Sequence, residues 1–444
     1  MNDLESHFHQ LEDSYQSWLI TGQAGSGKST LIRYCSTYSQ KKIILLASTG
    51  VAAHLINGHT LHAFFGFHPG ITEKDIQTMT ISKKHERLLA EIDTFFIDEI
   101  SMVRADWIDC MELFLRRFGK LPHRAFGGYQ FVFCGDLFQL PPVVSSLEES
   151  IFNSYYSSPY FFSANSFSQF QYAWMVCQEN FRQTDHETVR LLQQIREGEI
   201  TENELKRVNE KVFPLSELGE DHLKIILTST HAKADAINHE RLQNLPSPVH
   251  TYSAVIEGVF PVKQYPTNRD LPLAVGAQIM FVSNDPSGRF VNGSLGVVEE
   301  IHEYEGSPVI TILLEDQSLV RLEREVFTYQ WISLNPVTFT LESEAIGRFV
   351  QFPVQLAWAI TIHKSQGKTF SSVHVDLGKG AFSTGQAYVA LSRCRYFNAL
   401  TLQSPLRKED LQVDPRIKIF EKQCAMKQNL LYNNENTLKE KNHE

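Results

Sequence analysis

A glycine-rich loop near the start of the chain constrains the fold more than any other feature. Residues 22–29 (GQAGSGKS) match the pattern G-x-x-x-x-G-K-[ST] and lie between a short apolar run, residues 17–22, and a helical pattern. A loop placed in this way lets backbone N–H groups curl around phosphate oxygens, and the helix N-terminus favours negative charge. We therefore expect an α/β domain in which Lys28 reaches the β- and γ-phosphates of a nucleotide and Ser29 ligates Mg²⁺.

A pair of acidic residues follows a second apolar run. Residues 94–98 (TFFID) end in Asp98, and Glu99 comes next. Downstream of a phosphate loop, Asp98 is placed to hold Mg²⁺, and Glu99 is placed to orient and deprotonate an attacking water. The alternative is that the pair only caps the helix that follows. Together the two motifs indicate hydrolysis of a nucleoside triphosphate, without indicating what the energy drives.

Short apolar runs alternate with helical patterns along the first part of the chain. The runs at 17–22, 43–48, 94–98 and 130–135 predict strands of a parallel sheet that is covered on both faces. Residues 102–118 carry apolar side chains at three- and four-residue spacing, so they predict an amphipathic helix. This order predicts an α/β domain with right-handed crossovers.

A second α/β block is expected after the first, since 444 residues are enough for roughly three domains. Its predicted strands are residues 172–178, 224–229 and 399–404, its predicted helix covers 185–198, and a longer run at 353–361 resumes the pattern.

Two other stretches follow a different pattern. Residues 286–352 contain glycine-punctuated β signals, which predict a small antiparallel module inserted into the second block. Residues 405–444 are polar and charged; they predict one helix near 417–426 and then a frayed tail.

Composition excludes several classes of protein. With 42% hydrophobic and 21% charged residues, the chain is not expected to be disordered. It has no apolar run of about 18 residues, and its acidic N-terminus lacks a signal-peptide pattern. The six cysteines are scattered without a C-x-x-C pair, so we expect buried, reduced thiols in a cytoplasmic protein, nucleoid-associated if bacterial.

Four further segments identify the family that this chain resembles: 135–142 (GDLFQLPP), 180–183 (NFRQ), 361–367 (TIHKSQG) and 386–393 (QAYVALSR). With them the chain resembles the superfamily-one helicases, and more closely the Pif-one and RecD-like branch, which translocates 5′ to 3′ on single-stranded DNA. The resemblance covers about residues 20–404. Supporting segments are 49–53 (TGVAA), 58–65 (GHTLHAFF) and 98–102 (DEISM).

The resemblance implies a particular α/β architecture. It consists of two RecA-like P-loop domains, a small β-barrel similar to Src-homology-three (SH3-like) barrels inserted in the second, and a small wedge inserted in the first. The implied boundaries are 1–175 for the first domain with the wedge at 66–92, 176–285 and 353–404 for the two parts of the second, 286–352 for the barrel, and 405–444 for a C-terminal helix and tail.

The resemblance also implies the roles of residues at an ATP site between the two domains. Gln139 matches the residue that senses the γ-phosphate, and Arg182 and Arg393 match arginine fingers that stabilise charge on the transferring phosphoryl group. Each arginine has the alternative of being an exposed helix charge. The expected catalytic residues are Lys28, Glu99, Gln139, Arg182 and Arg393. The expected ATP-binding residues are Gly22, Ala24, Gly25, Ser26, Gly27, Lys28, Ser29, Thr30, Gln139, Arg182, Gly367 and Arg393, with Ser29 and Asp98 on Mg²⁺.

DNA is expected to cross the tops of both domains. Hydroxyl and N–H groups suit phosphates, while aromatic and imidazole rings can stack on bases without reading their sequence. For Phe64 the alternative is a place in the core. The implied DNA-binding residues are Thr49, Gly50, Thr60, His62, Phe64, Thr230, His231, Thr361, His363, Lys364 and Ser365.

The chain departs from the family pattern at two places. Ser48 stands where the family usually has proline. The adenine-reading glutamine segment is short, with Gln10 only 12 positions before Gly22.

The expected function is that of an ATP- and Mg²⁺-dependent DNA helicase that acts 5′ to 3′, as a monomer, on single strands and single-strand/duplex junctions. G-quadruplex DNA is a further substrate that the family allows, and DNA repair, recombination and telomere maintenance are the family's processes. The rivals are an RNA translocase, a DNA-binding subunit that uses ATP only as a switch, and a non-enzymatic scaffold. The last two would be marked by a damaged Glu99, Arg182 or Arg393, and all three are present.

The net charge of −10 argues against a DNA binder held by global charge. The charge is, however, unevenly distributed. Residues 14–72 contain four basic and no acidic residues, residues 353–403 contain five basic and one acidic, and residues 297–325 contain two basic and eight acidic. We therefore expect a local groove with a modest salt dependence of DNA binding.

Overall fold

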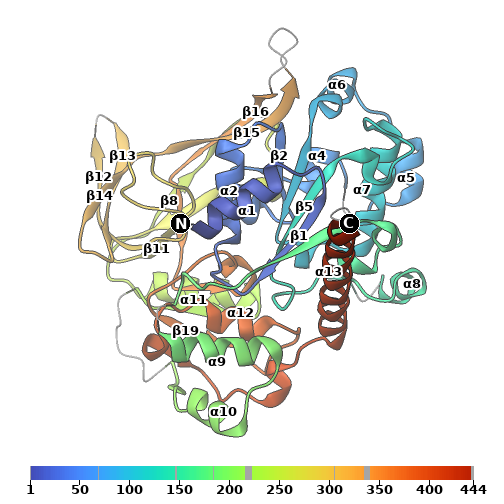
Figure 1. The fold of residues 1–444 in the computed structure, drawn as a ribbon. Helices are drawn as coiled ribbons and strands as arrows, with labels where there is room; N and C mark the ends of the chain where they lie inside the picture. The colour runs from blue at the N-terminus through green and yellow to red at the C-terminus, as the bar shows by residue number, and fades with distance from the viewer. Residues whose placement is uncertain are drawn as a thin grey trace.

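The computed structural model describes residues 2–68, 70–145, 148–183, 185–215, 223–304, 306–334 and 341–441. Two parallel α/β sheets and a set of antiparallel strands make up the molecule (Figure 1). No helix in these described residues combines the length and apolar composition needed to cross a membrane. All six cysteines are buried and free, as predicted.

The first α/β unit is built on a six-stranded sheet of order β3-β2-β4-β5-β1-β6, in which neighbouring strands are all parallel. Its central strands are buried, which explains their continuous apolar runs. The strands are β1 (Ser17–Gly22), β2 (Ile43–Ala47), β3 (His59–Thr60), β4 (Thr94–Asp98), β5 (Gln130–Gly135) and β6 (Tyr172–Cys177).

The assignment of residues 172–178 to the start of a second block is wrong. Strand β6 pairs in parallel with β1, with Ser17 opposite Tyr172, and so forms the edge of the first sheet. A short apolar run has the same sequence pattern whichever sheet it joins, so pairing had to be decided by the tertiary structure.

Helices cover this sheet. The predicted helix 102–118 begins three residues later, because Ile100–Met102 form a separate 3₁₀ turn before it. Within 66–92, the predicted wedge, two short helices pack into the core of the first unit through Ile76, Leu88 and Leu89. The helices are α1 (Asn2–Glu12), α2 (Lys28–Tyr38), α3 (Gly50–Leu55), α4 (Leu61–Phe65), α5 (Glu73–Thr78), α6 (Lys83–Glu91), α7 (Ala105–Phe118) and α8 (Glu149–Tyr155).

The second α/β unit is built on a four-stranded parallel sheet of order β18-β7-β19-β20. The predicted helix at 185–198 is confirmed together with its ends: the Asp185 side chain accepts hydrogen bonds from two backbone N–H groups at the start, and Gly198 is left-handed at the end. The elements are β7 (Ile225–Thr228), β18 (Ala359–Thr361), β19 (Val373–Asp376), β20 (Leu400–Leu402), α9 (His186–Glu197), α10 (Glu202–Asn209), α11 (His231–Gln243) and α12 (Gln386–Ser392).

The remaining strands form the β module, three antiparallel sheets of order β14-β13-β12-β11-β17, β15-β16-β9 and β10-β8. The predicted start at residue 286 is too late, since antiparallel pairing begins at residue 250; residues 305 and 335–340 lie outside the described residues. The strands are β8 (His250–Ser253), β9 (Val255–Gly258), β10 (Asp270–Leu273), β11 (Gln278–Phe281), β12 (Leu295–Tyr304), β13 (Ser307–Leu314), β14 (Leu319–Leu322), β15 (Glu325–Leu334), β16 (Leu341–Gln351) and β17 (Val354–Leu356).

The β module is joined to both α/β units. The predicted run at 353–361 is two strands in different sheets, β17 in the module and β18 in the second unit. Strands β15 and β16 reach across toward α6, and β15 contacts it (Figure 1).

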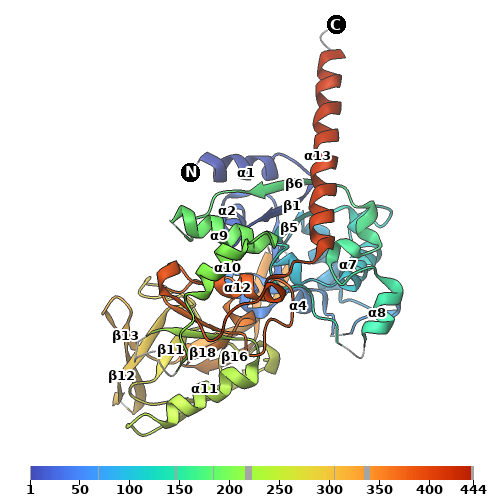
Figure 2. The same ribbon diagram turned by 90° about the horizontal axis from the view of Figure 1, so that it is seen from below.

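The C-terminal helix α13 (Pro415–Lys441) is longer than the predicted 417–426, and the expected fraying after residue 426 is wrong. Figure 2 shows that it projects from the body of the molecule. Its start follows the second unit, yet Phe420 stacks on Phe162 of the first unit, with ring centroids 4.3 Å apart. The helix therefore ties the two α/β units together.

Candidate ATP site and nucleic-acid interface

The glycine-rich loop runs from Gly22, the last residue of β1, to α2, whose first residues are Lys28, Ser29 and Thr30. Gly25 and Gly27 have left-handed backbone angles, with φ of 83° and 82°. A Cβ at Gly25 would lie 2.5 Å from the Cβ of Arg182, and one at Gly27 would lie 3.2 Å from the Phe181 ring. The loop therefore needs glycine both for its conformation and for the close approach of the segment after β6.

Lys28 and Ser29 begin α2. The Lys28 ammonium donates to the backbone oxygens of Gly22 (2.8 Å) and Gln23 (2.9 Å), so it is folded back onto the loop. The Ser29 hydroxyl donates to Oδ2 of Asp98 at 3.0 Å. A hydroxyl and a carboxylate in contact, next to a phosphate loop, are the donor set that fits Mg²⁺.

Glu99 follows β4 in a left-handed conformation, with φ of 51° and ψ of 47°. Burial, followed by the charge of Asp98, raises the pKa of its carboxyl group to about 7. Burial also raises the pKa of Asp98. A carboxyl group with a pKa near neutrality suits a general base, because it can both accept and release a proton at working pH.

Two arginines face this site from beyond the first sheet. Arg393 is 1% exposed, and its guanidinium donates to the Val389 carbonyl at 3.0 Å and to the Ser392 hydroxyl at 2.8 Å. Arg182 donates to the Ser392 carbonyl at 3.1 Å. Burial, and then the neighbouring Arg393 charge, lowers the pKa of Arg182.

Neither guanidinium forms an ion pair with any described residue. One buried and one partly buried guanidinium, both held by neutral oxygens, are poised for an anion, which fits the phosphate end of a nucleotide. The alternative that Arg393 is an exposed helix charge is wrong.

Gln139 and Gly367 connect the two units at the site. The Gln139 side chain donates to Asp136 at 3.4 Å and accepts from Gln366 of the second unit at 3.3 Å. Gly367 is left-handed, and a Cβ there would lie 2.7 Å from Leu55 of α3. Both predicted residues therefore lie where the units meet.

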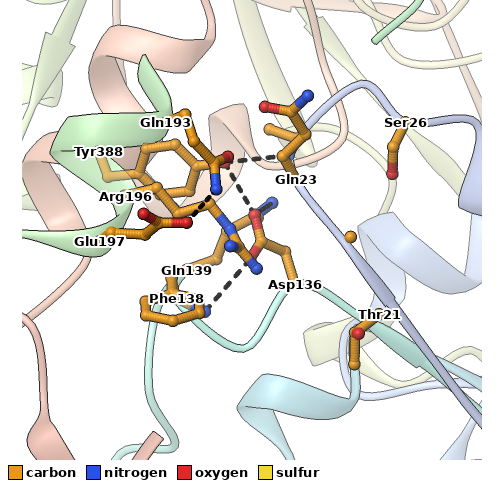
Figure 3. Close-up of polar contacts among 12 residues, drawn as sticks. Thr21, Gln23, Ser26, Asp136, Phe138, Gln139, Gln193, Arg196, Glu197 and Tyr388 are labelled. Carbon is orange, nitrogen blue, oxygen red and sulfur yellow. Dashed lines mark hydrogen bonds and ion pairs between the residues drawn. The ribbon is translucent and has the colours of Figure 1, made fainter. Parts of the chain in front are cut away.

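A buried polar cluster that the sequence did not indicate lies beside the loop (Figure 3). The Tyr388 hydroxyl accepts from the Ala24 backbone N–H at 3.0 Å and donates to Oδ2 of Asp136 at 2.9 Å. Arg196 donates from Nε to Oδ1 of the same carboxylate at 3.0 Å. Tyr388 and Asp136 stand in segments that carried the family resemblance, but the only signal for Arg196 was its place in the last turn of a predicted helix.

A cleft of about 620 Å³ lies between the first unit, the β module and the segment after β18. Of the predicted DNA-binding residues, four line it: Thr49, Gly50, Thr60 and Lys364. Lys364 is exposed there. The module supplies lining residues that the sequence did not indicate, namely Phe260, Tyr265, Phe327, Tyr329 and Asn292, and the second unit adds Lys368.

The predicted threonines hold the backbone of this region. The hydroxyls of Thr49, Thr60 and Thr230 accept from backbone N–H groups at the starts of α3, α4 and α11. The Thr361 hydroxyl accepts from the Lys364 N–H at 3.2 Å. These residues form the starts of helices and turns, which explains why their spacing followed the family pattern.

Two predicted DNA contacts are wrong at the level of the side chain. Phe64 is 5% exposed, and its ring makes edge contacts with Phe65 and Phe95 in the core, as the alternative held. Ser365 is fully buried, and its hydroxyl donates to the Ile362 carbonyl at 2.7 Å. Neither side chain can reach a ligand in the cleft.

The predicted histidines lie in different places. The His62 ring packs on Trp107 with centroids 4.1 Å apart. His363 lines a smaller cavity of about 120 Å³ together with Ser29, Asp98, Glu99 and Thr49, so it faces the nucleotide side. Burial, and then the neighbouring His231, lowers the pKa of His363. His231 itself is exposed at the start of α11.

Comparison with known proteins places this geometry in a family. Residues 7–206 match the family described as PIF1-like helicase. The ATP-dependent DNA helicase Pif1 of Bdellovibrio bacteriovorus is 31% identical over 92% of this chain and 89% of its own length. The ATP-dependent DNA helicase PIF1 of Danio rerio is 34% identical over 90% of this chain. The chain spans only 59% of that longer protein.

Solved structures agree over nearly the whole chain. The crystal structure of Bacteroides sp Pif1 in complex with ADP–AlF4 has a TM-score of 0.87 and 32% identity over 97% of this chain and 98% of its own. That of Bacteroides Pif1 bound to single-stranded DNA has a TM-score of 0.70 and 33% identity over 95% and 96%. The chain therefore belongs to the PIF1-like helicases, and its two α/β units are RecA-like.

Proposed function

We propose that this protein is an ATP-dependent DNA helicase that hydrolyses ATP between its two RecA-like units, translocates 5′ to 3′ on single-stranded DNA and unwinds the duplex ahead. The observation that carries the proposal is the arginine pair, buried Arg393 and partly buried Arg182, that faces the phosphate loop without an acidic partner in the described residues. Because the pair gains an anion only when a triphosphate is bound, closure of the units depends on the nucleotide.

The residues of the ATP site divide the work. The loop amides and Lys28 bind the phosphates, which requires the ammonium to exchange the carbonyls of Gly22 and Gln23 for phosphate oxygens. Ser29 and Asp98 would hold Mg²⁺, which would supply positive charge to the phosphates. Glu99 accepts the proton of the attacking water, and Gln139 links the phosphate end to the second unit.

The 620 Å³ cleft is the proposed path of the DNA strand. Its walls combine hydroxyl groups, aromatic rings and the side chain of Lys364, which suits phosphate contacts and base stacking without sequence reading. A relative solved bound to single-stranded DNA supports DNA as the ligand. We assign the β module, in place of the predicted SH3-like barrel, to clamping the strand, and helices α5 and α6 to the duplex-splitting wedge.

A strand-displacement assay on tailed duplexes tests the proposal. We expect ATP-dependent unwinding of a duplex with a 5′ single-stranded tail and none of a duplex with a 3′ tail. Unwinding only from the 3′ tail would contradict the polarity, and ATP hydrolysis without unwinding of either substrate would favour the switch-like rival.

The choice of nucleic acid is tested in parallel. ATP hydrolysis should be stimulated more by single-stranded DNA than by RNA of the same sequence; the reverse order would favour the RNA translocase. Activity on G-quadruplex DNA and action as a monomer stay predictions from the family resemblance, to be tested by unfolding of a labelled quadruplex and by the dependence of unwinding on protein concentration.

A further inference from the structure

The polar cluster of Figure 3 joins four separate parts of the chain. Ala24 lies in the phosphate loop and Asp136 follows β5, both in the first RecA-like unit. Arg196 lies in the last turn of α9 and Tyr388 in the first turn of α12, both in the second. The cluster therefore spans the boundary between the units directly beside the loop.

Every polar group of the cluster has its partner. The Tyr388 hydroxyl accepts one hydrogen bond, from Ala24 (3.0 Å), and donates one, to Asp136 (2.9 Å). Asp136 is fully buried, so its carboxylate depends on Tyr388 and Arg196 in place of water. Arg196 is itself held between the ring of Phe138, 4.1 Å away, and Glu421 of α13, 3.5 Å away.

Helix α12 connects this cluster to the arginine that faces Glu99. All residues of the helix are buried, and Arg393 follows its last residue. The Arg393 guanidinium donates back to the carbonyl of Val389, the residue after Tyr388. The helix is thus fixed near its start by the Tyr388 hydroxyl and presents Arg393 at its end.

The helix start is also pressed against the first unit. Gly385 precedes α12 with a left-handed φ of 74°, and a Cβ there would collide with the backbone oxygens of Phe138 and Gln139. So close an approach leaves the start of the helix little room to shift independently of the first unit.

We propose that Tyr388 is a positioning residue for ATP hydrolysis, whose hydroxyl clasps Ala24 of the phosphate loop and Asp136 and thereby sets where Arg393 stands relative to the bound triphosphate. The inference rests on the proposed function, because it assumes hydrolysis between the two units. Tyr388 contacts the phosphate loop but not the reacting atoms. It therefore acts through α12 and through the orientation of the Ala24 amide.

The variant Tyr388→Phe removes only the hydroxyl. We expect kcat of DNA-stimulated ATP hydrolysis to fall about 10-fold while KM for ATP stays within about twofold, because the loop and the ring packing remain. Tyr129→Phe is the matched control: its buried hydroxyl also accepts from a backbone N–H (Lys120, 3.1 Å) and donates to an oxygen (Leu89, 2.7 Å), but entirely within the first unit. The control should keep kcat even if it loses comparable thermal stability.

A double-mutant cycle tests the route through Arg393. In an Arg393→Lys background, Tyr388→Phe should lower kcat by less than twofold, because the group that it positions has already been replaced. Independent, multiplicative effects would overturn the proposal, and so would an unchanged kcat in Tyr388→Phe.

Asp136→Asn replaces the carboxylate to which the Tyr388 hydroxyl donates, so it should reproduce the kcat loss. Full kcat in this variant would also contradict the proposal. If the wild-type protein itself shows no DNA-stimulated hydrolysis, the proposed function fails and not only this inference.

Discussion

The candidate ATP site and the proposed DNA cleft are built in different ways. The phosphate and Mg²⁺ groups of the ATP site lie on short loops at the carboxyl ends of the neighbouring strands β1, β4 and β5, and they touch directly, as Ser29 and Asp98 do at 3.0 Å. The cleft is assembled from three parts of the chain, and the predicted residues around it mostly cap their own helices or pack in the core. Parallel strands bring their ends together automatically, whereas the cleft depends on how separate parts are placed.

This difference shows in which motifs a role can be assigned to each side chain, and in which the motif only fixes the local structure. At the ATP site the residue types are fixed by chemistry, because a phosphate needs N–H groups and cations and Mg²⁺ needs oxygens. At the cleft the motif Thr60–Phe64 fixes a helix start and its core face, and only part of it reaches the opening. Loss of ATP-site groups should therefore abolish activity, whereas loss of single cleft groups should only weaken binding.

The largest effect is expected for Lys28→Ala. Removing the ammonium that binds the phosphates should lower DNA-stimulated ATP hydrolysis at least about 100-fold, while affinity for single-stranded DNA in the absence of nucleotide is kept. Lys120→Ala, which removes a surface ion pair with Asp93, is the control and should retain activity. Retained turnover in Lys28→Ala would break the assignment of the ATP site.

Glu99→Gln should come next. The amide keeps the shape of the side chain but cannot accept the proton of water, so kcat should fall about 100-fold with KM for ATP nearly unchanged. Single-turnover hydrolysis measures the chemical step directly. A loss confined to KM would mean that Glu99 binds the nucleotide and is not the base.

We expect Lys368 to make the affinity of the cleft for single-stranded DNA depend on pH. Burial lowers the pKa of its ammonium to about 8, and the side chain lines the cleft beside Asn292. The group is cationic below that pH and neutral above it, so affinity for single-stranded DNA should weaken about fivefold as pH rises through 8, equivalent to one contact of roughly 1 kcal/mol. Fluorescence anisotropy measures Kd, and Lys368→Gln should bind with no such step; an unchanged step would place the titrating group elsewhere.

Lys364→Ala should have a smaller effect. Loss of one exposed phosphate contact should weaken DNA binding a few-fold and reduce the slope of log K against log salt by about 0.7. The measurement is a salt titration of Kd for the wild type and the variant. A wild-type slope that implies ten or more neutralised phosphates would contradict a polar, stacking cleft.

The smallest effect on DNA binding is expected for Phe64→Leu. Because the ring lies in the core, the variant should lose about 1 kcal/mol of unfolding free energy while Kd for DNA stays within experimental error. Urea unfolding and anisotropy on the same sample separate the two effects. Weaker binding without lost stability would restore Phe64 as a stacking residue.

The local structure of the protein could be predicted from the sequence alone. The sequence predicted the buried strands β1, β4 and β5, the phosphate loop, the acidic pair and helix α9, because each depends on a local apolar pattern or a glycine-rich turn within a few residues. Those strand ends then fix most of the ATP site, since parallel pairing leaves them little freedom.

Features that depend on pairing between distant segments could be seen only in the folded molecule. The tertiary structure placed β6 in the first sheet, began the β module at residue 250, turned Phe64 into the core and brought Tyr388 to Asp136 across 252 positions of the chain. An apolar run or a tyrosine has the same local pattern in any of these settings. Its partner depends on how whole sheets and helices pack. That packing results from many contacts together and not from any single segment.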